Sequence, residues 1–244
     1  MIWVLAALTF LVTGCIAGND QSSSFSRDTA PEQSQTEFYS IITETFEQGN
    51  VNVQYPQISG LGDDEKEKAI NYLISDHILY TVIKVQDESL MAEQTLELNY
   101  QVTAQTTGIL SILYTGSANI EGSAFATNNV YAITIDLEDV IGLKLSDFTE
   151  VDTDLAKKIK QSTNITSSYS GTFDERLLPA IQNEKDNYII SGLTEEWAYY
   201  TFCVTPDSLI VSIAISHAGG DYVLIEVPGE YMRNYFFRKR YISE

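Results

Sequence analysis

Segments with the residue alternation of β-strands follow one another along much of this chain, and they constrain the fold more than any other feature. Residues 95–105 alternate through Leu96 and Leu98, residues 109–115 are largely apolar, and residues 129–137 alternate again. Short glycine-containing segments separate these three stretches. Short connections join antiparallel neighbours, so we expect them to form one antiparallel sheet.

Further strand-like segments lie on both sides of this central group. They are predicted at residues 38–46, 51–58, 197–204, 209–216 and 222–227. The clearest helix is predicted over residues 64–86, where apolar residues recur at helical spacing and Asp64 with Glu67 resembles a capping box. Shorter helices are predicted over 152–161 and 174–183. Strands in runs with few helices between them indicate an α+β fold, with mixed, mainly antiparallel sheets packed against one long helix and one or two shorter ones.

The N-terminal residues resemble an export signal. Met1 to Val12 is almost wholly apolar, and as a helix it would be about 17 Å long, short of the roughly 30 Å hydrocarbon core. Val12-Thr13-Gly14-Cys15 resembles a bacterial lipobox. We therefore predict a lipoprotein signal peptide over 1–14 and lipidation of Cys15. The alternatives are an ordinary signal peptide with an accidental cysteine, or a buried N-terminal strand.

The segment that follows is predicted to be a flexible tether. Residues 15–36 begin with the lipidated cysteine and continue with few apolar side chains. A coil of about 19 residues has an r.m.s. reach near 25 Å, which would lift a folded body away from the lipid headgroups. We expect an N-terminal α+β block over 37–145, a C-terminal block over 146–237 and a basic tail over 238–244. The expected location is extracytoplasmic, with the chain anchored to the cell membrane.

Charge restricts the partners. The chain has 34 Asp and Glu against 14 Lys and Arg, a formal net charge of -20. A polyanion of this size repels the phosphates of nucleic acids, so no nucleic-acid partner is expected. A partner attracted by charge should be a cationic protein, a cationic peptide or a cation.

Catalytic signatures are absent from the sequence. The two histidines are His77, interpreted as a boundary or core residue of the long helix, and His217. If Cys15 is acylated, Cys203 has no disulfide partner, and its place within a strand favours a small buried hydrophobe over a nucleophile. We therefore predict a protein that is not an enzyme, with no catalytic residues, no metal ligands and no cofactor.

Carboxylates are the strongest candidates for chemistry. They cluster as Asp136, Glu138, Asp139 and Asp147, and again as Glu150, Asp152 and Asp154. Either cluster could bind Ca²⁺ or hydrolyse a glycan between two acids, although neither has the spacing of an EF-hand loop. The interpretation that we favour is a solvated acidic face. The basic cluster Arg238-Lys239-Arg240 either pairs with acids of the body or is solvated.

Two blocks of the sequence resemble a known pair of extracytoplasmic domains. The first is Tyr55-Pro56-Gln57-Ile58-Ser59-Gly60-Leu61, followed by a helix with Ile70-Asn71 and by the strands that run to Phe148. The second combines residues 202–209 with residues 215–220 and 223–228. Both are similar to the domains of unknown function found in RsiV-type anti-sigma factors and in the non-catalytic part of PdaC-type peptidoglycan deacetylases.

The resemblance implies a module that binds rather than reacts. In the anti-sigma members the outer domain recognises lysozyme, a cationic protein, and the charge of this chain suits such a partner. The family's hairpin tip, usually Pro-Tyr-Ala, corresponds to Ser216-His217-Ala218 here, so partner-binding residues are predicted at Ser216, His217, Ala218 and Gly219. Loss of the aromatic anchor is expected to weaken or redirect binding.

These observations favour a lipid-anchored, non-enzymatic binding or sensing module for a cationic protein or peptide, such as lysozyme, or for a cell-wall component. Two alternatives stay open at this point. One is a carboxylate-dependent cell-wall hydrolase, possibly using His217, and the other is a structural surface lipoprotein.

Overall fold

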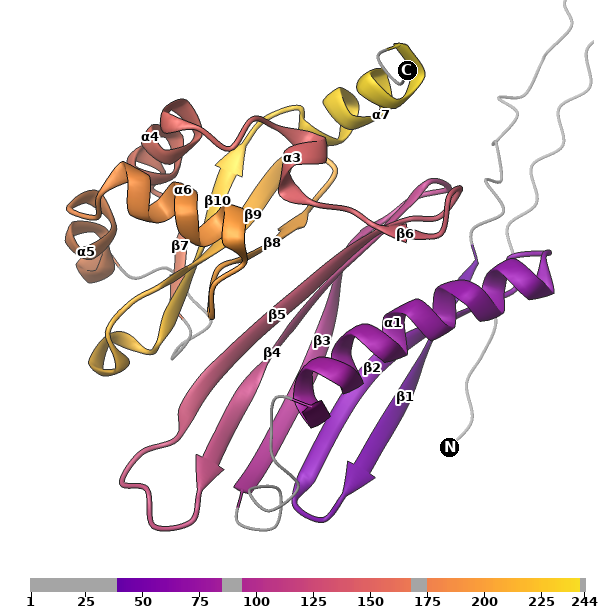
Figure 1. Cartoon of the computed structure of the whole chain (residues 1–244), viewed down its shortest axis with the longest axis horizontal. Coiled ribbons are helices and arrows are strands. Elements are labelled where there is room, and N and C mark those ends of the chain that lie inside the picture. Colours follow the sequence, from indigo (N-terminus) through magenta and orange to yellow (C-terminus); the bar gives the residue numbers. More distant parts are fainter. Residues whose placement is uncertain (1–38, 85–93, 168–174, 242–244) are drawn as a thin grey trace, which may run out of the picture. The chain divides into compact units, whose positions relative to one another are not determined.

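The computed structural model describes residues 39–84, 94–167 and 175–241 (Figure 1). The predicted signal peptide, Cys15 and the tether lie outside the described residues, as do the last two residues of the predicted long helix. The described residues form an α+β fold, as the sequence predicted. None of their helices is both long enough and apolar enough to cross a membrane.

The first sheet has six strands in chain order, β1-β2-β3-β4-β5-β6. Their bounds are β1 Ser40–Gln48, β2 Val51–Ser59, β3 Gln94–Gln105, β4 Ile109–Ile120, β5 Thr127–Asp136 and β6 Ile141–Gly142. All neighbouring strands are antiparallel except β2 and β3, which are parallel. The prediction of a mixed, mainly antiparallel sheet is therefore confirmed.

Helix α1, Asp64–Lys84, covers one face of this sheet (Figure 1). Ile70, Ile74 and Ile78 are spaced four residues apart, so they lie on one side of the helix, and all three are buried. They share a core with residues of the strands, including Leu98 and Tyr114. The helix predicted over 64–86 is thus confirmed for its described part.

The N-terminal cap of α1 differs from the prediction. The helix begins at Asp64, and the capping side chain is Asp63, whose Oδ1 accepts a hydrogen bond from the Lys66 amide at 3.1 Å. Glu67 accepts instead from the Gly60 amide at 2.8 Å. The expected pair of Asp64 and Glu67 was wrong by one residue, because Asp64 is already helical.

Asn71 of α1 fixes the outer end of β2. Strand β2 pairs with β3 only over Val51–Val53, so its later backbone groups lack a strand neighbour on that side. The Asn71 side chain takes this place at Ile58, accepting from the amide at 2.7 Å and donating to the carbonyl at 2.9 Å. The motif that carries the sequence resemblance therefore serves to attach the helix to the sheet.

A β-bulge between Val102 and Ala104 shifts the register of β3 against β4. A bulge inserts one residue and so exchanges the faces of the residues beyond it. Val102 packs against the core beneath α1, whereas Ala104 belongs to the core shared with the second sheet. The bulge lets one strand contribute to both cores.

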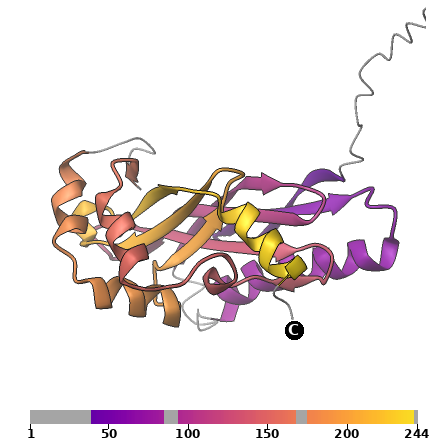
Figure 2. The ribbon, with the colours of Figure 1, turned by 90° about the horizontal axis from the view of Figure 1, so that it is seen from above.

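The second sheet has four strands in the order β7-β10-β9-β8, all antiparallel. Their bounds are β7 Ile165–Ser167, β8 Thr201–Val204, β9 Ser208–Ala214 and β10 Tyr222–Pro228. The helical elements of this part are α3 Leu145–Phe148, α4 Thr153–Gln161, η1 Glu175–Leu177, α5 Leu178–Gln182, α6 Asp186–Glu195, η2 His217–Gly219 and α7 Tyr231–Tyr241. Helix α4 contacts α5, α6 and β10 (Figure 2).

Two predicted elements are altered. The strand expected at 197–204 begins only at Thr201, because Glu196 and Tyr199 adopt positive φ angles of 53° and 67° that interrupt extended structure. The helix expected at 174–183 is a 3₁₀ turn followed by α5, and its first residue lies outside the described residues. Helix α6 was not predicted.

The described part of the predicted basic tail, residues 238–241, belongs to helix α7. Arg238, Lys239 and Arg240 lie in the last turns of α7. This helix is held by Tyr231, Met232 and Tyr235, which are buried in the core of the second sheet. Basic residues at a helix C-terminus also interact favourably with the helix dipole.

Strand β8 packs against the first sheet. Cys203 clusters with Leu113 and Val130 of the first sheet, on the face opposite to α1. The Val204 amide donates to Ser111 Oγ at 3.0 Å, and this buried hydroxyl pairs with that of Thr134 at 2.8 Å. Part of the first sheet's second face is therefore covered by β8, and the rest is not.

Candidate functional site

The hairpin between β9 and β10 carries the predicted partner-binding residues, which are Ser216, His217, Ala218 and Gly219. The first three are exposed, and His217 begins the turn η2. His217 Nδ1 lies 2.7 Å from Asp221 Oδ1. An ionised carboxylate can only accept a hydrogen bond, so in this pair Nδ1 is the donor.

Asp221 links this hairpin tip to the first sheet. Its residue is only 6% exposed and has a φ of 73°, a left-handed conformation that aspartate tolerates better than most residues. The other carboxylate oxygen accepts from the Asn128 amide of β5 at 2.8 Å, and Asn128 Nδ2 donates to the Gly220 carbonyl at 3.3 Å. Sequence reasoning missed this contact because the two segments lie 93 residues apart.

Aromatic rings surround the tip. Phe125 is 71% exposed and approaches His217 edge-on, with ring centroids 6.1 Å apart. Tyr199 stacks on Tyr222 at 6.4 Å. Burial, and then the charge of Asp221, raise the pKa of Tyr222 to about 12. The tip therefore offers one exposed aromatic ring and one exposed imidazole, and the buried Asp221 carboxyl group lies beneath them.

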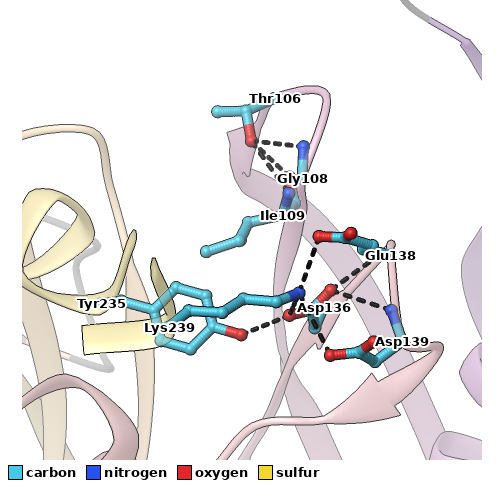
Figure 3. A network of polar contacts seen from close by, with 8 residues as sticks. All are labelled: Thr106, Gly108, Ile109, Asp136, Glu138, Asp139, Tyr235 and Lys239. Atoms are coloured by element: carbon cyan, nitrogen blue, oxygen red, sulfur yellow. Dashed lines mark hydrogen bonds and ion pairs between the residues drawn. The ribbon is translucent and has the colours of Figure 1, made fainter. Parts of the chain in front are cut away.

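The first acidic cluster lies elsewhere, at the other end of β5, and is built around Lys239 of α7 (Figure 3). Lys239 Nζ lies 2.7 Å from Asp136 Oδ2, 3.0 Å from Glu138 Oε2 and 3.1 Å from Asp139 Oδ2. The Tyr235 hydroxyl also donates to Asp136. Asp136 is 1% exposed, so its charge is compensated almost wholly by these groups.

The electrostatics of this cluster agree with its geometry. Burial acts to raise the pKa of Asp136, but hydrogen bonds from Lys239, Tyr235 and the amides of Asp139 and Glu138 lower it overall. The same three carboxylates raise the pKa of Lys239 above its usual range, against the effect of burial. The interpretation as a solvated acidic face is wrong for Asp136, because α7 supplies a lysine that sequence proximity did not reveal.

The remaining acids of the two clusters are mostly structural. Asp147 accepts from the backbone amide that precedes α3 at 2.7 Å. Asp152 caps α4 by accepting from the amides of Asp154 and Leu155 at 2.9 and 3.0 Å, and Asp154 pairs with Lys157 at the surface. Across the part of the chain that the structure describes, no three His, Cys, Asp or Glu residues are arranged to hold a metal ion.

The uncovered part of the first sheet forms the second candidate surface. On the face that β8 leaves open, ten residues of β1 to β4 have hydroxyl, carboxamide or carboxylate side chains, and all but one of these ten are exposed. We call this surface the polar face. It consists of Thr45, Glu47, Asn52, Gln54, Thr95, Glu97, Asn99, Thr115, Ser117 and Asn119.

The charge of the polar face is one-sided. Strands β1 to β5 contain no Lys, Arg or His at all. Glu47 and Glu97 are exposed, and no basic side chain among the described residues pairs with either of them. These two carboxylates, unlike Asp136, are therefore available to an external cation.

Two residues singled out in the sequence have structural environments. Cys203 is fully buried, as predicted, and burial raises the pKa of its thiol to about 12, so it is not a thiolate at neutral pH. His77 is partly buried on α1, and burial lowers the pKa of its imidazole although a hydrogen bond with the Ala132 backbone opposes this shift.

Comparison with known proteins gives similarity of fold only. No protein-family model matches the chain, and no curated protein matches it. It is similar to a DUF3298 family protein from Pseudomonas aeruginosa PAO1, with 12% identity over 78% of this chain and 89% of that one, at a TM-score of 0.46. A member of the same family from Bacteroides fragilis gives 12% identity over 82% and 90%, at a TM-score of 0.45. Neither description states a ligand, a partner or a reaction.

Proposed function

We propose that this protein is a lipid-anchored, extracytoplasmic binding module that recognises a cationic protein or peptide, with lysozyme as the first candidate. The polar face is its contact surface, and the hairpin tip with His217 forms one border. The proposal is consistent with the resemblance to the outer domains of RsiV-type anti-sigma factors, which is itself a prediction from sequence.

The observation that carries this proposal is the unneutralised charge of the first sheet. Five neighbouring strands without a basic residue present Glu47 and Glu97 among neutral hydrogen-bonding groups. Such a surface attracts cations from a distance and hydrogen-bonds them on contact. Because these charges are exposed, added salt should screen the attraction over about 8 Å at physiological ionic strength.

A binding role is favoured over hydrolysis by the state of the acids. A glycan hydrolase of the usual kind needs a carboxyl group whose pKa is raised, so that it can donate a proton. The buried carboxyl group of the first acidic cluster, Asp136, has a lowered pKa, which is the opposite of what a general acid needs. Its neighbours are occupied by Lys239, which leaves them poorly placed as an acid and base pair.

The test of the proposal is calorimetric titration of the full chain with lysozyme at low and physiological salt. We expect binding that weakens as salt is added. The double variant Glu47→Gln/Glu97→Gln should weaken it by roughly three- to tenfold at low salt, since exposed ion pairs contribute up to about 1 kcal/mol each.

The matched control is Glu150→Gln/Asp207→Asn, which removes the same charge from exposed positions outside the first sheet. It should leave the affinity nearly unchanged. Equal weakening by both double variants would show an effect of net charge alone. Release of soluble fragments from purified peptidoglycan by the wild-type chain would support the hydrolase instead.

The lipid anchor is tested separately. Cys15→Ser should shift the protein from the membrane fraction to the soluble fraction, and the wild-type chain should incorporate labelled fatty acid. An unmodified Cys15 on a protein recovered inside the cell would contradict the anchor and the proposed location.

A further inference from the structure

One line of paired residues crosses the polar face from its edge strand to the hairpin tip. We call it the cross-strand row. Its members, each beside the next on a neighbouring strand, are Glu47, Asn52, Glu97, Ser117 and Asn128. The last of them is the residue whose amide binds Asp221 and so holds the tip.

The spacing of the row follows from sheet geometry. Neighbouring strands lie about 4.8 Å apart, so Glu47 and Glu97, two strands from each other, are separated by about 10 Å. Asn52 lies midway between them. The whole row from Glu47 to Asn128 crosses four such steps, about 19 Å.

From this spacing we infer that the polar face binds a basic α-helix lying across the strands, with Lys or Arg at positions i and i+7. This inference rests on the proposed function and specifies its partner. Seven helical residues rise about 10.5 Å and return to the same side of the helix, which matches the distance between Glu47 and Glu97. An extended segment presents same-side residues about 6.8 or 13.6 Å apart, and neither distance matches.

The partner-helix residues between its two basic side chains would also face specific groups of the row. The helix residue at i+3 or i+4 lies over Asn52, where a neutral polar side chain can exchange hydrogen bonds with the carboxamide. An acidic residue there would be repelled by Glu47 and Glu97 on either side. A helix of about 13 residues covers the 19 Å row and brings its end to the tip, where the His217 imidazole and the exposed Phe125 ring lie.

The experiment uses the full chain and two peptides of equal length and composition. One peptide carries two lysines at i and i+7, and the other carries them at i and i+5, which places them about 140° apart around the helix axis. Affinity is measured by calorimetry at low salt, and helix content by circular dichroism before and after mixing.

We expect the i, i+7 peptide to bind at least fivefold more tightly and to gain helix on binding. Glu47→Gln and Glu97→Gln should each reduce that preference, whereas Glu150→Gln should not. Equal affinities for the two peptides, or binding without a gain of helix, would overturn the inference.

The outcomes separate this inference from the proposed function. If lysozyme binds in a salt-dependent way through Glu47 and Glu97 but the peptides show no spacing preference, the helical partner is wrong and the binding function stands. If neither lysozyme nor either peptide binds, both are wrong.

Discussion

The two halves of the described fold handle negative charge in different ways. Residues 39–142 hold three Lys or Arg against fifteen Asp or Glu, while residues 143–241 hold ten against fourteen. All three basic residues of the first half lie on α1. The excess charge of this protein is therefore concentrated in the half that contains the polar face.

The second half pairs some of its acids locally and also supplies a cation to the first half. Lys160 pairs with Asp186 at 2.9 Å, and Arg233 pairs with Glu230 at 3.2 Å. Lys239 reaches the buried Asp136 of β5. The comparison indicates that an acid with a built-in partner serves the fold, whereas an exposed acid on a surface without cations is available for recognition.

Among the substitutions that test this comparison, Lys239→Met is expected to cause the largest loss of folding stability. The change removes the cation and leaves the carboxylate of Asp136, 1% exposed, without its charged partner. Breaking such a pair costs about 3 kcal/mol of the free energy of unfolding. Urea unfolding measures the loss, and Arg240→Gln, one residue away and exposed, should change it by less than about 0.5 kcal/mol. Equal stabilities of Lys239→Met and wild type would contradict the assigned role.

A smaller loss of folding stability is expected from Gly116→Ala in the first half. A Cβ at Gly116 would lie 1.8 Å from the Glu97 carbonyl oxygen, so β3 and β4 would have to separate. Overpacking of this kind costs about 2 kcal/mol. Thermal unfolding tests it, with Gly142→Ala as control, since no atom lies within 4 Å of the Cβ added there. A tolerated Gly116→Ala would mean that the two strands are less closely held than described.

The dependence of folding stability on pH below neutrality should distinguish the buried carboxyl group of Asp136 from the exposed ones. The pKa of Asp136 is lower in the folded chain than in the unfolded one, so the unfolded state binds more protons in acid. Its stabilising contribution is present above the unfolded pKa of about 3.9 and is lost as the pH falls through the folded value. The stability difference between wild type and Asp136→Asn should therefore narrow below about pH 4. Urea midpoints across this range measure it, and a constant difference would refute it.

The smallest effect is expected from a single cation placed on the polar face. Ser117→Lys lies directly opposite Glu97 and would compensate its charge, so lysozyme affinity at low salt should fall about threefold. Asn187→Lys on α6 adds the same charge at an exposed position of the second half. It should have little effect on affinity. Indistinguishable binding by these two variants would remove the distinction between the halves.

Local patterns predicted most of the strands and the long helix. Ile70, Ile74 and Ile78 repeat every four residues, which reports a buried helix face directly. Strand β4 was expected to end at residue 115 because Gly116 follows, yet it continues to Ile120. In the structure Gly116 lets β3 approach closely. From sequence alone, the low strand propensity of glycine predicted that the strand ends there.

The features that prediction missed depend on contacts between distant residues. The Lys239–Asp136 pair joins positions 103 residues apart, and although each lies in a charged cluster that the sequence shows, no local pattern indicates that these two clusters meet. The predicted tip residues 216–219 follow from the resemblance to the family's hairpin tip, but their attachment to β5 through Asp221 and Asn128 does not. The polar face likewise exists only through the register of four strands.

The hydrogen bonds between Asn71 and Ile58 also bear on how this chain could associate with other chains. Where β2 and β3 diverge, bare peptide groups would invite a foreign strand to add itself to the sheet. The Asn71 side-chain amide hydrogen-bonds the backbone N–H and C=O of Ile58, so these two groups already have a partner within the protein. At this position a side-chain amide takes the place that an added strand would need, so pairing there would first require Asn71 to be displaced.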